Sequence, residues 1–285
     1  MKGDHTPSQM ASPENGLAVP SEPGRVEAVW KLISTEARRL SQSEHRLAPL
    51  LEDIFLSRES LPCSVAARLS RKLAREDMSR DELFPLLQEI LVEHPDLVNG
   101  LICDLIAIDE RDPACLSLMQ PLLFYKGFLA MTTYRLGHQM WQNERHDLAY
   151  YFQSLASEVF GVDIHPAARV GCGIFLDHAT SVVIGETSIV ENNVSILHEV
   201  TLGGTGKTSG DRHPIVRSEV MIGAGAKILG RVEIGQGAKI GAGSVVLDDV
   251  PPHSTVAGVP AVVVGTTDSE NPAAAMDQSL GCSGI

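Results

Sequence analysis

The sequence has few cysteines, few aromatic residues and no long apolar run. The five cysteines, at positions 63, 103, 115, 172 and 282, form no Cys-x-x-Cys pair, so a disulfide framework or a cysteine-based zinc site is not expected. No uncharged apolar stretch approaches ~18 residues, and the first 24 residues lack the apolar segment of a signal peptide. We therefore expect no membrane span and a reducing, cytoplasmic location.

Basic charge is also scarce. The 285 residues include 23 Lys and Arg against 36 Asp and Glu, which gives a formal net charge of −13. Nucleic acids and membrane surfaces are bound by basic faces, so neither is an expected partner. The stretch from Thr205 to Ile240 is an exception, with six basic and three acidic residues. This local excess favours a small anionic ligand, with a solvated surface as the alternative.

A six-residue repeat runs from Ile164 to Val262. Aliphatic residues begin most blocks of six, and glycine follows an aliphatic residue in Ile222-Gly223, Ile234-Gly235 and Ile240-Gly241. Helices have a period near 3.6 and surface strands a period of 2. A period of six with glycines predicts very short strands joined by tight turns, which is the signature of a parallel β-helix. Its open ends and flat faces favour self-association, so we expect a homo-oligomer.

The first half of the chain has helical periodicity. Ser79-Arg-Asp-Glu82 reads as a capping box that begins a helix, and Asn99-Gly100 and Asp112-Pro113 are expected to punctuate this half. We expect an α + β protein with four parts: a flexible tail (1–24), a helical domain (25–160), a β-helix domain (161–265) and a flexible C-terminal tail (266–285).

Polar residues interrupt the hexads at three places. These are Asp163 to Pro166, Leu176 to Thr180, and an inserted loop from Thr205 to Pro214. Loops that interrupt a regular solenoid commonly carry function. The loop segment 203–208 resembles a phosphate-binding P-loop, but Thr201 stands where that motif needs glycine.

Several histidines occur near these interruptions, and each has an ordinary structural interpretation. His165 and His198 could form hydrogen bonds at a corner or on the surface. Together with His178 and His213 they could instead supply imidazoles to zinc, as in metal-dependent carbonic anhydrases of this fold, although Arg212 beside His213 disfavours a dication. The same repeat and histidines are also compatible with a β-helix acyltransferase or with a non-enzymatic scaffold.

Longer strings carry a family resemblance. DIHPAARVGCGIFLDHAT, VSILHEVTLGGTGKTSGDRHP, AKIGAGSVVL and VPPHSTVAGVPA resemble serine O-acetyltransferases, and the resemblance extends from about Glu110 to Gly265. It implies a left-handed β-helix and transfer of the acetyl group of acetyl-CoA to L-serine, which gives O-acetyl-L-serine and CoA in cysteine biosynthesis. A different hydroxyl acceptor, homoserine or a sugar, is the alternative.

The resemblance also implies roles for individual residues. His178 would be the general base, because a neutral imidazole suits proton removal from a hydroxyl, and Asp163 would orient its ring. Arg212 and His213 would bind the serine carboxylate, and Asp112 and Asp177 its ammonium group. Neither a metal nor a permanently bound cofactor is implied. The positions implied for CoA are Gly204, Gly223, Ala224, Lys239 and Ala242.

Partners follow from the same resemblance. It implies a trimer with active sites between adjacent subunits, with two trimers joined through the helical domains. It also implies feedback inhibition by L-cysteine in the serine pocket. The terminal Ile285 matches the family ending that inserts into O-acetylserine sulfhydrylase, although the preceding Gly-Cys-Ser-Gly differs from the acidic family ending.

Overall fold

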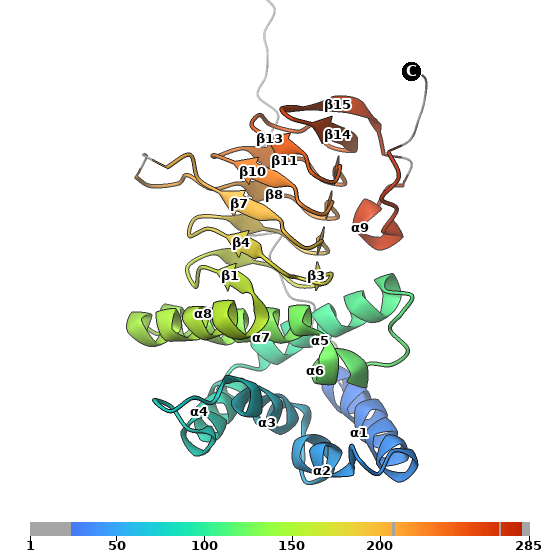
Figure 1. Cartoon of the computed structure of the whole chain (residues 1–285), viewed down its shortest axis with the longest axis vertical. Coiled ribbons are helices and arrows are strands. Elements are labelled where there is room, and N and C mark those ends of the chain that lie inside the picture. Colours follow the sequence, from blue (N-terminus) through green and yellow to red (C-terminus); the bar gives the residue numbers. More distant parts are fainter. Residues whose placement is uncertain (1–23, 207–208, 268, 281–285) are drawn as a thin grey trace, which may run out of the picture.

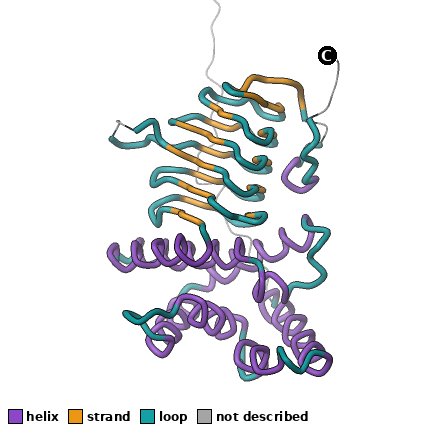
Figure 2. Tube along the Cα trace, viewed as in Figure 1, coloured by secondary structure: helices purple, strands orange, loops and turns teal. Residues whose placement is uncertain are grey.

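The computed structural model describes residues 24–206, 209–267 and 269–280. Helices form one end of the molecule, and a stack of short strands rises from them (Figure 1, Figure 2). Within the described residues, none of the helices is long and apolar enough to cross a membrane. The helical elements are α1 (Arg25–Ser43), α2 (Ala48–Leu51), the π-helical turn η2 (Glu52–Leu56), α3 (Leu61–Leu73), α4 (Arg80–Glu93), α5 (Pro95–Arg111), α6 (Met119–Phe124), α7 (Lys126–Gln142), α8 (His146–Phe160) and α9 (Pro272–Ala275).

The strands are two to six residues long, and from β1 to β14 successive strands belong to different sheets. The three sheets have the orders β1-β4-β7-β10-β13, β11-β8-β5-β2 and β15-β14-β12-β9-β6-β3. All pairs are parallel except β14 with β15. The strands are β1 (Val162–Ile164), β2 (Arg169–Val170), β3 (Phe175–Leu176), β4 (Val182–Ile184), β5 (Ile189–Val190), β6 (Ser195–Ile196), β7 (Thr201–Gly203), β8 (Ile215–Val216), β9 (Met221–Ile222), β10 (Lys227–Leu229), β11 (Glu233–Ile234), β12 (Lys239–Ile240), β13 (Val245–Val246), β14 (Ser254–Gly258) and β15 (Ala261–Thr266).

This topology is the parallel β-helix that the six-residue period predicts, with three sides to each coil. A regular coil takes 18 residues, as in the pairing of Lys227 with Val245. Two coils are longer. Val162 pairs with Val182, 20 residues later, and Thr201 pairs with Lys227, 26 residues later. Because the core stays in register, the additional residues must leave at the corners, and the two corners concerned carry His178 and Arg212.

The helical prediction is also confirmed in detail at α4. Ser79 and Glu82 form the capping box, and the Ser79 amide donates to the Glu82 carboxylate at 2.8 Å. The face with Leu83, Leu87 and Leu91 is buried. The expected break at Asn99-Gly100 is wrong, since both residues lie inside α5.

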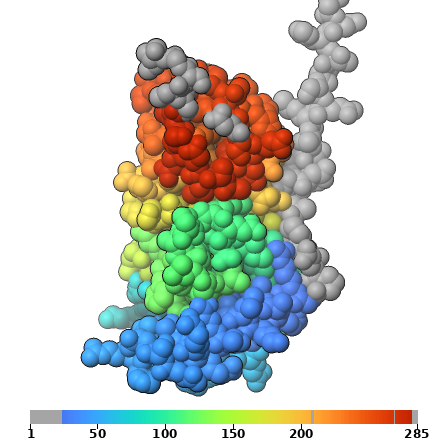
Figure 3. Space-filling view, turned by 90° about the vertical axis from the view of Figure 1, so that its right-hand side faces the viewer, coloured from blue at the N-terminus to red at the C-terminus, as the bar shows by residue number. Residues whose placement is uncertain are grey.

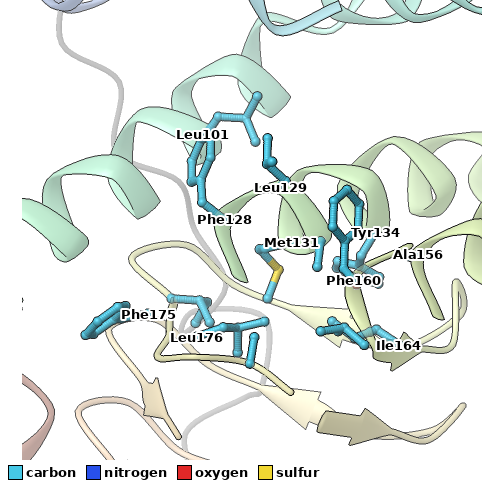
Figure 4. Packing of buried hydrophobic residues seen from close by; sticks show 14 of the residues in the cluster. Leu101, Phe128, Leu129, Met131, Tyr134, Ala156, Phe160, Ile164, Phe175 and Leu176 are labelled. Atoms are coloured by element: carbon cyan, nitrogen blue, oxygen red, sulfur yellow. The ribbon is translucent and has the colours of Figure 1, made fainter. Parts of the chain in front are cut away.

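The base of the β-helix rests on α7 and α8, and the two parts share one continuous core. Figure 4 shows Phe128, Met131 and Phe160 of the helices facing Ile164 and Leu176 of the first coil. Gly127 permits this approach, because a Cβ at that position would lie 2.1 Å from the Leu176 carbonyl oxygen.

A buried ion pair reinforces the same junction. Asp104 of α5 and Arg135 of α7 are joined by hydrogen bonds of 2.8 and 2.9 Å, and their side chains are 1% and 9% exposed. The Asp104 carboxylate also accepts from the Ile174 amide at 2.8 Å, and Arg135 donates to the Gly171 carbonyl at 2.6 Å. Arg111 of α5 donates to the Gly173 carbonyl at 3.1 Å. Three charged side chains of the helices, Asp104, Arg111 and Arg135, therefore hold the turn between β2 and β3.

The end of the chain folds back along the β-helix (Figure 1, Figure 3). Ala273 of α9 is buried, and its carbonyl accepts a hydrogen bond from the Ser195 hydroxyl at 2.8 Å. The Lys239 ammonium donates to the Ser279 carbonyl and lies 3.6 Å from the Asp277 carboxylate. A short apolar turn and several polar groups of residues 269–280 thus have partners on the six-stranded sheet. The flexibility expected from residue 266 onward stays a prediction.

Candidate active site

The additional residues of the first coil lie at the corner between β3 and β4, which we call the His178 corner (177–180 and its equivalents in later coils). Backbone hydrogen bonds to the second coil bracket the four residues from Asp177 to Thr180. In the second coil, only the two residues Leu197 and His198 lie between the equivalent backbone hydrogen bonds to the third coil. The insertion is therefore His178 and the alanine that follows it.

The insertion holds His178 in an unusual conformation. Its φ is 56°, in the left-handed region that residues other than glycine seldom adopt, and its side chain is 75% exposed. Strained residues of this kind cluster at functional sites, where the surrounding structure determines the conformation. The geometry thus presents an imidazole to solvent at a rigid corner.

A pocket of about 730 Å³ opens beside this imidazole. It lies between the His178 corner, the end of α5, the start of α7 and the folded-back tail. Three of the predicted site residues, Asp112, Asp177 and His178, line it together. The remaining lining residues are Arg111, Pro113, Ala114, Phe124, Tyr125, Lys126, Gly127, Phe175, Leu176, Ala275, Met276 and Gln278.

Two carboxylates, those of Asp112 and Asp177, line this pocket together with the cationic side chains of Arg111 and Lys126. Burial raises the pKa of Asp177, and the Asp112 carboxylate raises it further, while the neighbouring His178 acts in the opposite direction. The Nε2 atom of His178 lies 3.8 Å from Asp177 Oδ1. Burial, with a smaller effect of Asp112, raises the pKa of Tyr125 to about 12. A bound cation would relieve the repulsion between the carboxylates, so the pocket suits an ammonium group.

Some residues of this pocket were not given roles from the sequence. Lys126 donates a hydrogen bond to the Thr180 hydroxyl. Outside this lining, the ring of His198, which the sequence had already marked as a candidate, lies 5.8 Å from the His178 ring in an edge-on arrangement. Met276 and Gln278 come from the tail. Tyr125 and Lys126 lie in the mainly apolar stretch 121–131 of the sequence, and this stretch is the signal that could have marked them.

The second long coil forms another cluster, the Arg212 corner (185–187, 204–206 and 209–213). The Thr187 hydroxyl oxygen accepts hydrogen bonds from the amides of Arg212 and His213 at 3.0 and 3.1 Å. The Thr187 amide in turn donates to Nδ1 of His213 at 3.1 Å. Gly185 makes room for the ring, since a Cβ there would lie 2.1 Å from it.

Charges at the Arg212 corner are paired within the chain. Arg212 donates to the Glu186 carboxylate at 2.6 Å, and this hydrogen bond lowers the pKa of Glu186. Burial lowers the pKa of His213, and the positive charge of Arg212 adds to that effect. The imidazole of His213 therefore stays neutral at a pH where an ordinary histidine begins to be protonated.

The two clusters lie at adjacent corners of one chain. The sheet β1-β4-β7-β10-β13 separates them, because β4 follows the His178 corner and precedes the Arg212 corner. Asp163, on β1 of this sheet, accepts a hydrogen bond from Gln153 Nε2 at 2.6 Å, and its charge acts on His165. Within the described ranges, no hydrogen bond or ion pair joins Asp163 to His178.

The positions expected to bind CoA divide between the corners. Ala224 and Ala242 follow one another up the His178 corner, where the Gly243 amide donates to the Ala224 carbonyl at 2.7 Å. Gly223 belongs to the same corner, and a Cβ there would lie 2.6 Å from the Ala242 nitrogen. Gly204 instead lies at the Arg212 corner, where its Cβ would lie 3.4 Å from Arg212 Cγ. Lys239 contacts the tail.

The zinc alternative finds no support in the residues that the structure describes. They contain no group of three or more His, Cys, Asp or Glu side chains arranged to hold a metal ion. His178 and His198 lie at one corner, and His213 lies at the other with Thr187. Ile285 falls outside the described residues.

Two family models match the chain. The model "Serine acetyltransferase, N-terminal" matches residues 29–133, and "Bacterial transferase hexapeptide (six repeats)" matches residues 213–248. The serine acetyltransferase of Salmonella typhimurium is 51% identical over 253 residues, which cover 89% of this chain and 93% of the relative.

Solved structures agree. A serine acetyltransferase in complex with cysteine matches with a TM-score of 0.87 and 47% identity, over 89% of this chain and 99% of the other. The Brucella abortus enzyme in complex with coenzyme A has a TM-score of 0.84 and 48% identity, over 87% and 99%. The soybean enzyme complexed with serine has a TM-score of 0.83 and 50% identity, over 85% and 100%. From identity of this extent over nearly the whole length of its relatives, the chain belongs to the serine acetyltransferase family.

Proposed function

We propose that this protein transfers the acetyl group of acetyl-CoA to the hydroxyl of L-serine, giving O-acetyl-L-serine and CoA for cysteine biosynthesis. The observation that carries the proposal is the placement of His178. A two-residue insertion presents its imidazole at the mouth of a pocket that also contains Asp112 and Asp177. The relatives complexed with coenzyme A, serine and cysteine support the ligand classes.

The reaction needs one base and no covalent enzyme intermediate. The hydroxyl of serine is a weak nucleophile, and a neutral imidazole can take its proton as the oxygen attacks the thioester carbonyl. The tetrahedral intermediate then expels the CoA thiolate, and His178 returns the proton to sulfur. The side chain of His178 is 75% exposed, so substrates can reach its ring.

Recognition of serine would use opposite charges at its two ends. The ammonium group would lie between Asp112 and Asp177, where it offsets their repulsion. The carboxylate would bind the planar guanidinium of Arg212, with His213 beside it. Because Arg212 lies at the adjacent corner of the same chain, we propose that a neighbouring copy supplies it. A trimer with sites between subunits satisfies this requirement, and two trimers would join through their helical domains.

Acetyl-CoA would follow the His178 corner. Ala224 and Ala242 continue this corner beyond His198 in the later coils, so a narrow pantetheine arm could lie along it toward His178. The proposed phosphate contact of Lys239 requires movement of the tail, because Asp277 and the Ser279 carbonyl hold its ammonium group. The proposed contact of Gly204 belongs to the copy that supplies Arg212.

Asp163 remains the carboxylate proposed to orient His178. The two side chains are apart within one chain, so pairing them requires rotation of the exposed His178 side chain. We expect Asp163→Asn to fold normally and to lose most turnover, with Gln153→Ala as the control that removes only the neighbour of Asp163. Equal turnover of Asp163→Asn and the wild type would exclude the role.

Further partners follow from family membership. L-Cysteine would inhibit by occupying the serine pocket, because it has the same ammonium and carboxylate groups. The chain end at Ile285 would bind O-acetylserine sulfhydrylase. Removal of residues 283–285 should abolish binding to the sulfhydrylase in a pull-down and spare acetyl transfer, and unchanged binding would refute this role.

The deciding assay measures thiol release from acetyl-CoA with L-serine, L-homoserine or a sugar as acceptor. We expect release with serine, at least roughly tenfold slower release with the other two acceptors, and no dependence on added zinc. Faster release with another acceptor, or activity that needs zinc, would refute the assignment of the acceptor or of the metal-free mechanism.

A further inference from the structure

Two thiols meet at the junction between the helical domain and the β-helix. Cys103 lies on α5, and Cys172 lies in the turn between β2 and β3. They line one surface pocket of about 230 Å³, which also includes Arg25, Glu110 and Arg111. Neither thiol lines the pocket that contains His178. The proposed acetyl transfer assigns no role to these cysteines.

The surroundings hold the two thiols in place. The buried carboxylate of Asp104, next to Cys103, binds the amide of Ile174, and Arg135 binds the carbonyl of Gly171. These contacts flank Cys172 on both sides along the chain. The thiols are therefore brought together by rigid elements far apart in the sequence, and their meeting does not depend on a mobile loop.

The chemistry of the pair is asymmetric. The Cys172 thiol hydrogen-bonds to Cys103 and lowers the pKa of Cys103 to about 7; burial opposes this effect, and Arg25 assists it. The same contact, together with burial, raises the pKa of Cys172. Cys103 is also the more exposed of the two, at 9% against 3%. A thiolate is the nucleophile in thiol–disulfide exchange, so Cys103 is suited to attack and Cys172 to resolve.

We propose that Cys103 and Cys172 form a reversible redox site that reacts with small disulfides, such as oxidised glutathione. The product is a Cys103–Cys172 disulfide that cross-links the helical domain to the first coil. The Cys103 thiolate attacks one sulfur of the disulfide and releases one thiolate, which leaves a mixed disulfide on Cys103. Cys172 then loses its proton and attacks the Cys103 sulfur, and the second small thiolate leaves. Two protein thiols are oxidised, and one small disulfide is reduced to two thiols.

The positive charge of the pocket fits this class of oxidant. Arg25 and Arg111 outnumber Glu110 among the charged lining residues, and oxidised glutathione carries several carboxylates. Hydrogen-bonded sulfurs need only a short approach to reach the roughly 2.05 Å of a disulfide bond. A cross-link between residues 103 and 172 closes a long loop and restricts the unfolded chain. The oxidised protein should therefore unfold at a temperature higher by roughly 5–10 °C than the reduced protein.

The test uses the full-length protein, reduced with dithiothreitol, desalted and incubated with oxidised glutathione. Free thiols are then alkylated, and peptides are mapped without reduction. We expect a Cys103–Cys172 linked peptide, the rise in melting temperature, and reversal of both by dithiothreitol. Three outcomes would overturn the proposal. Both thiols could still be alkylated after the incubation, a glutathione adduct could persist on Cys103 in the wild type, or disulfides could form between chains.

Variants separate the two steps. Cys172→Ser should stop at the glutathione adduct on Cys103, because the resolving thiol is gone. Cys115→Ser is the matched control: Cys115 is half-buried outside this pocket, so the variant should still form the cross-link. The wild-type peptide map decides the proposal even if Cys172→Ser fails to fold. Acetyl transfer tests the proposed function separately, since neither thiol takes part in it.

Discussion

Replacing Asp104 by asparagine removes one charge from the ion pair at the junction of the two domains. The side chains of Asp104 and Arg135 are 1% and 9% exposed, so water cannot compensate Arg135 once the carboxylate is gone. Asparagine keeps an oxygen for the Ile174 amide and has nearly the same volume. The change therefore creates no cavity, but it removes the negative charge and replaces one of two accepting oxygens, such as the one that accepts from Arg135 Nε, with an NH2 donor.

The magnitude follows from the burial. Removing one partner of a buried, hydrogen-bonded ion pair costs about 3–5 kcal/mol. For a protein of this size, each kcal/mol lowers the melting temperature by roughly 2–4 °C, so Asp104→Asn should melt roughly 6–20 °C lower. Asp109→Asn is the control, because Asp109 lies on the same helix and is exposed. It should change stability by no more than about 0.5 kcal/mol.

The assay is unfolding followed by circular dichroism, at equal protein concentration for all variants because the proposed assembly would also stabilise the fold. The variant Asp104→Asn/Arg135→Gln should be more stable than Asp104→Asn alone, since it leaves no unpaired charge. Our reasoning would be refuted if Asp104→Asn matched Asp109→Asn, or if the double variant showed simple addition of the two single effects.

Three further predictions concern the site and the response to pH. His178→Ala should retain the wild-type circular dichroism and lose about 10²–10⁴-fold in kcat, the contribution typical of a general base; retained turnover would exclude that role. Arg212→Lys should raise the KM for serine by roughly tenfold or more and change the KM for acetyl-CoA little, because lysine lacks the planar fork; an unchanged KM for serine would remove Arg212 from the carboxylate site. Burial lowers the pKa of His138 below its ordinary value of 6.5. The unfolded chain therefore binds the proton first as the pH falls below 6.5, and the free energy of unfolding decreases there by up to about 1.4 kcal/mol per pH unit. In urea titrations from about pH 7 to 5, the free energy of unfolding of His138→Gln should depend less steeply on pH than that of the wild type. An equal dependence in both proteins would contradict this account.

Regularity made much of the fold predictable. Each hexad places one aliphatic side chain in the core, so the period alone predicted the coils, and the inserted loop before Arg212 marked one of the two long coils. The two additional residues at His178 were not predicted, because the six-residue phase can be continued through that segment. The capping box at Ser79 was predictable because its hydrogen bonds join residues close together in the sequence. The expected break at Asn99-Gly100 failed, because burial of α5 outweighs the weak local preference of glycine for turns.

The tertiary structure was needed wherever residues distant in the sequence meet. The packing of the tail on Ser195 and Lys239, and the surroundings of Asp163, depend on which surfaces the folded chain brings together.

The six-residue period by itself determined that the chain forms a β-helix, since a repeating burial pattern is a local property of the sequence. Its motifs also identified the family, and the site residues that they indicate stay a prediction. Only the tertiary structure decided that Asp112 joins Asp177 and His178 in one pocket, that Arg212 lies at the adjacent corner, and that Cys103 meets Cys172. These placements depend on how α5 packs against the first coil and on how many residues leave each corner, and neither is encoded in a short stretch of sequence.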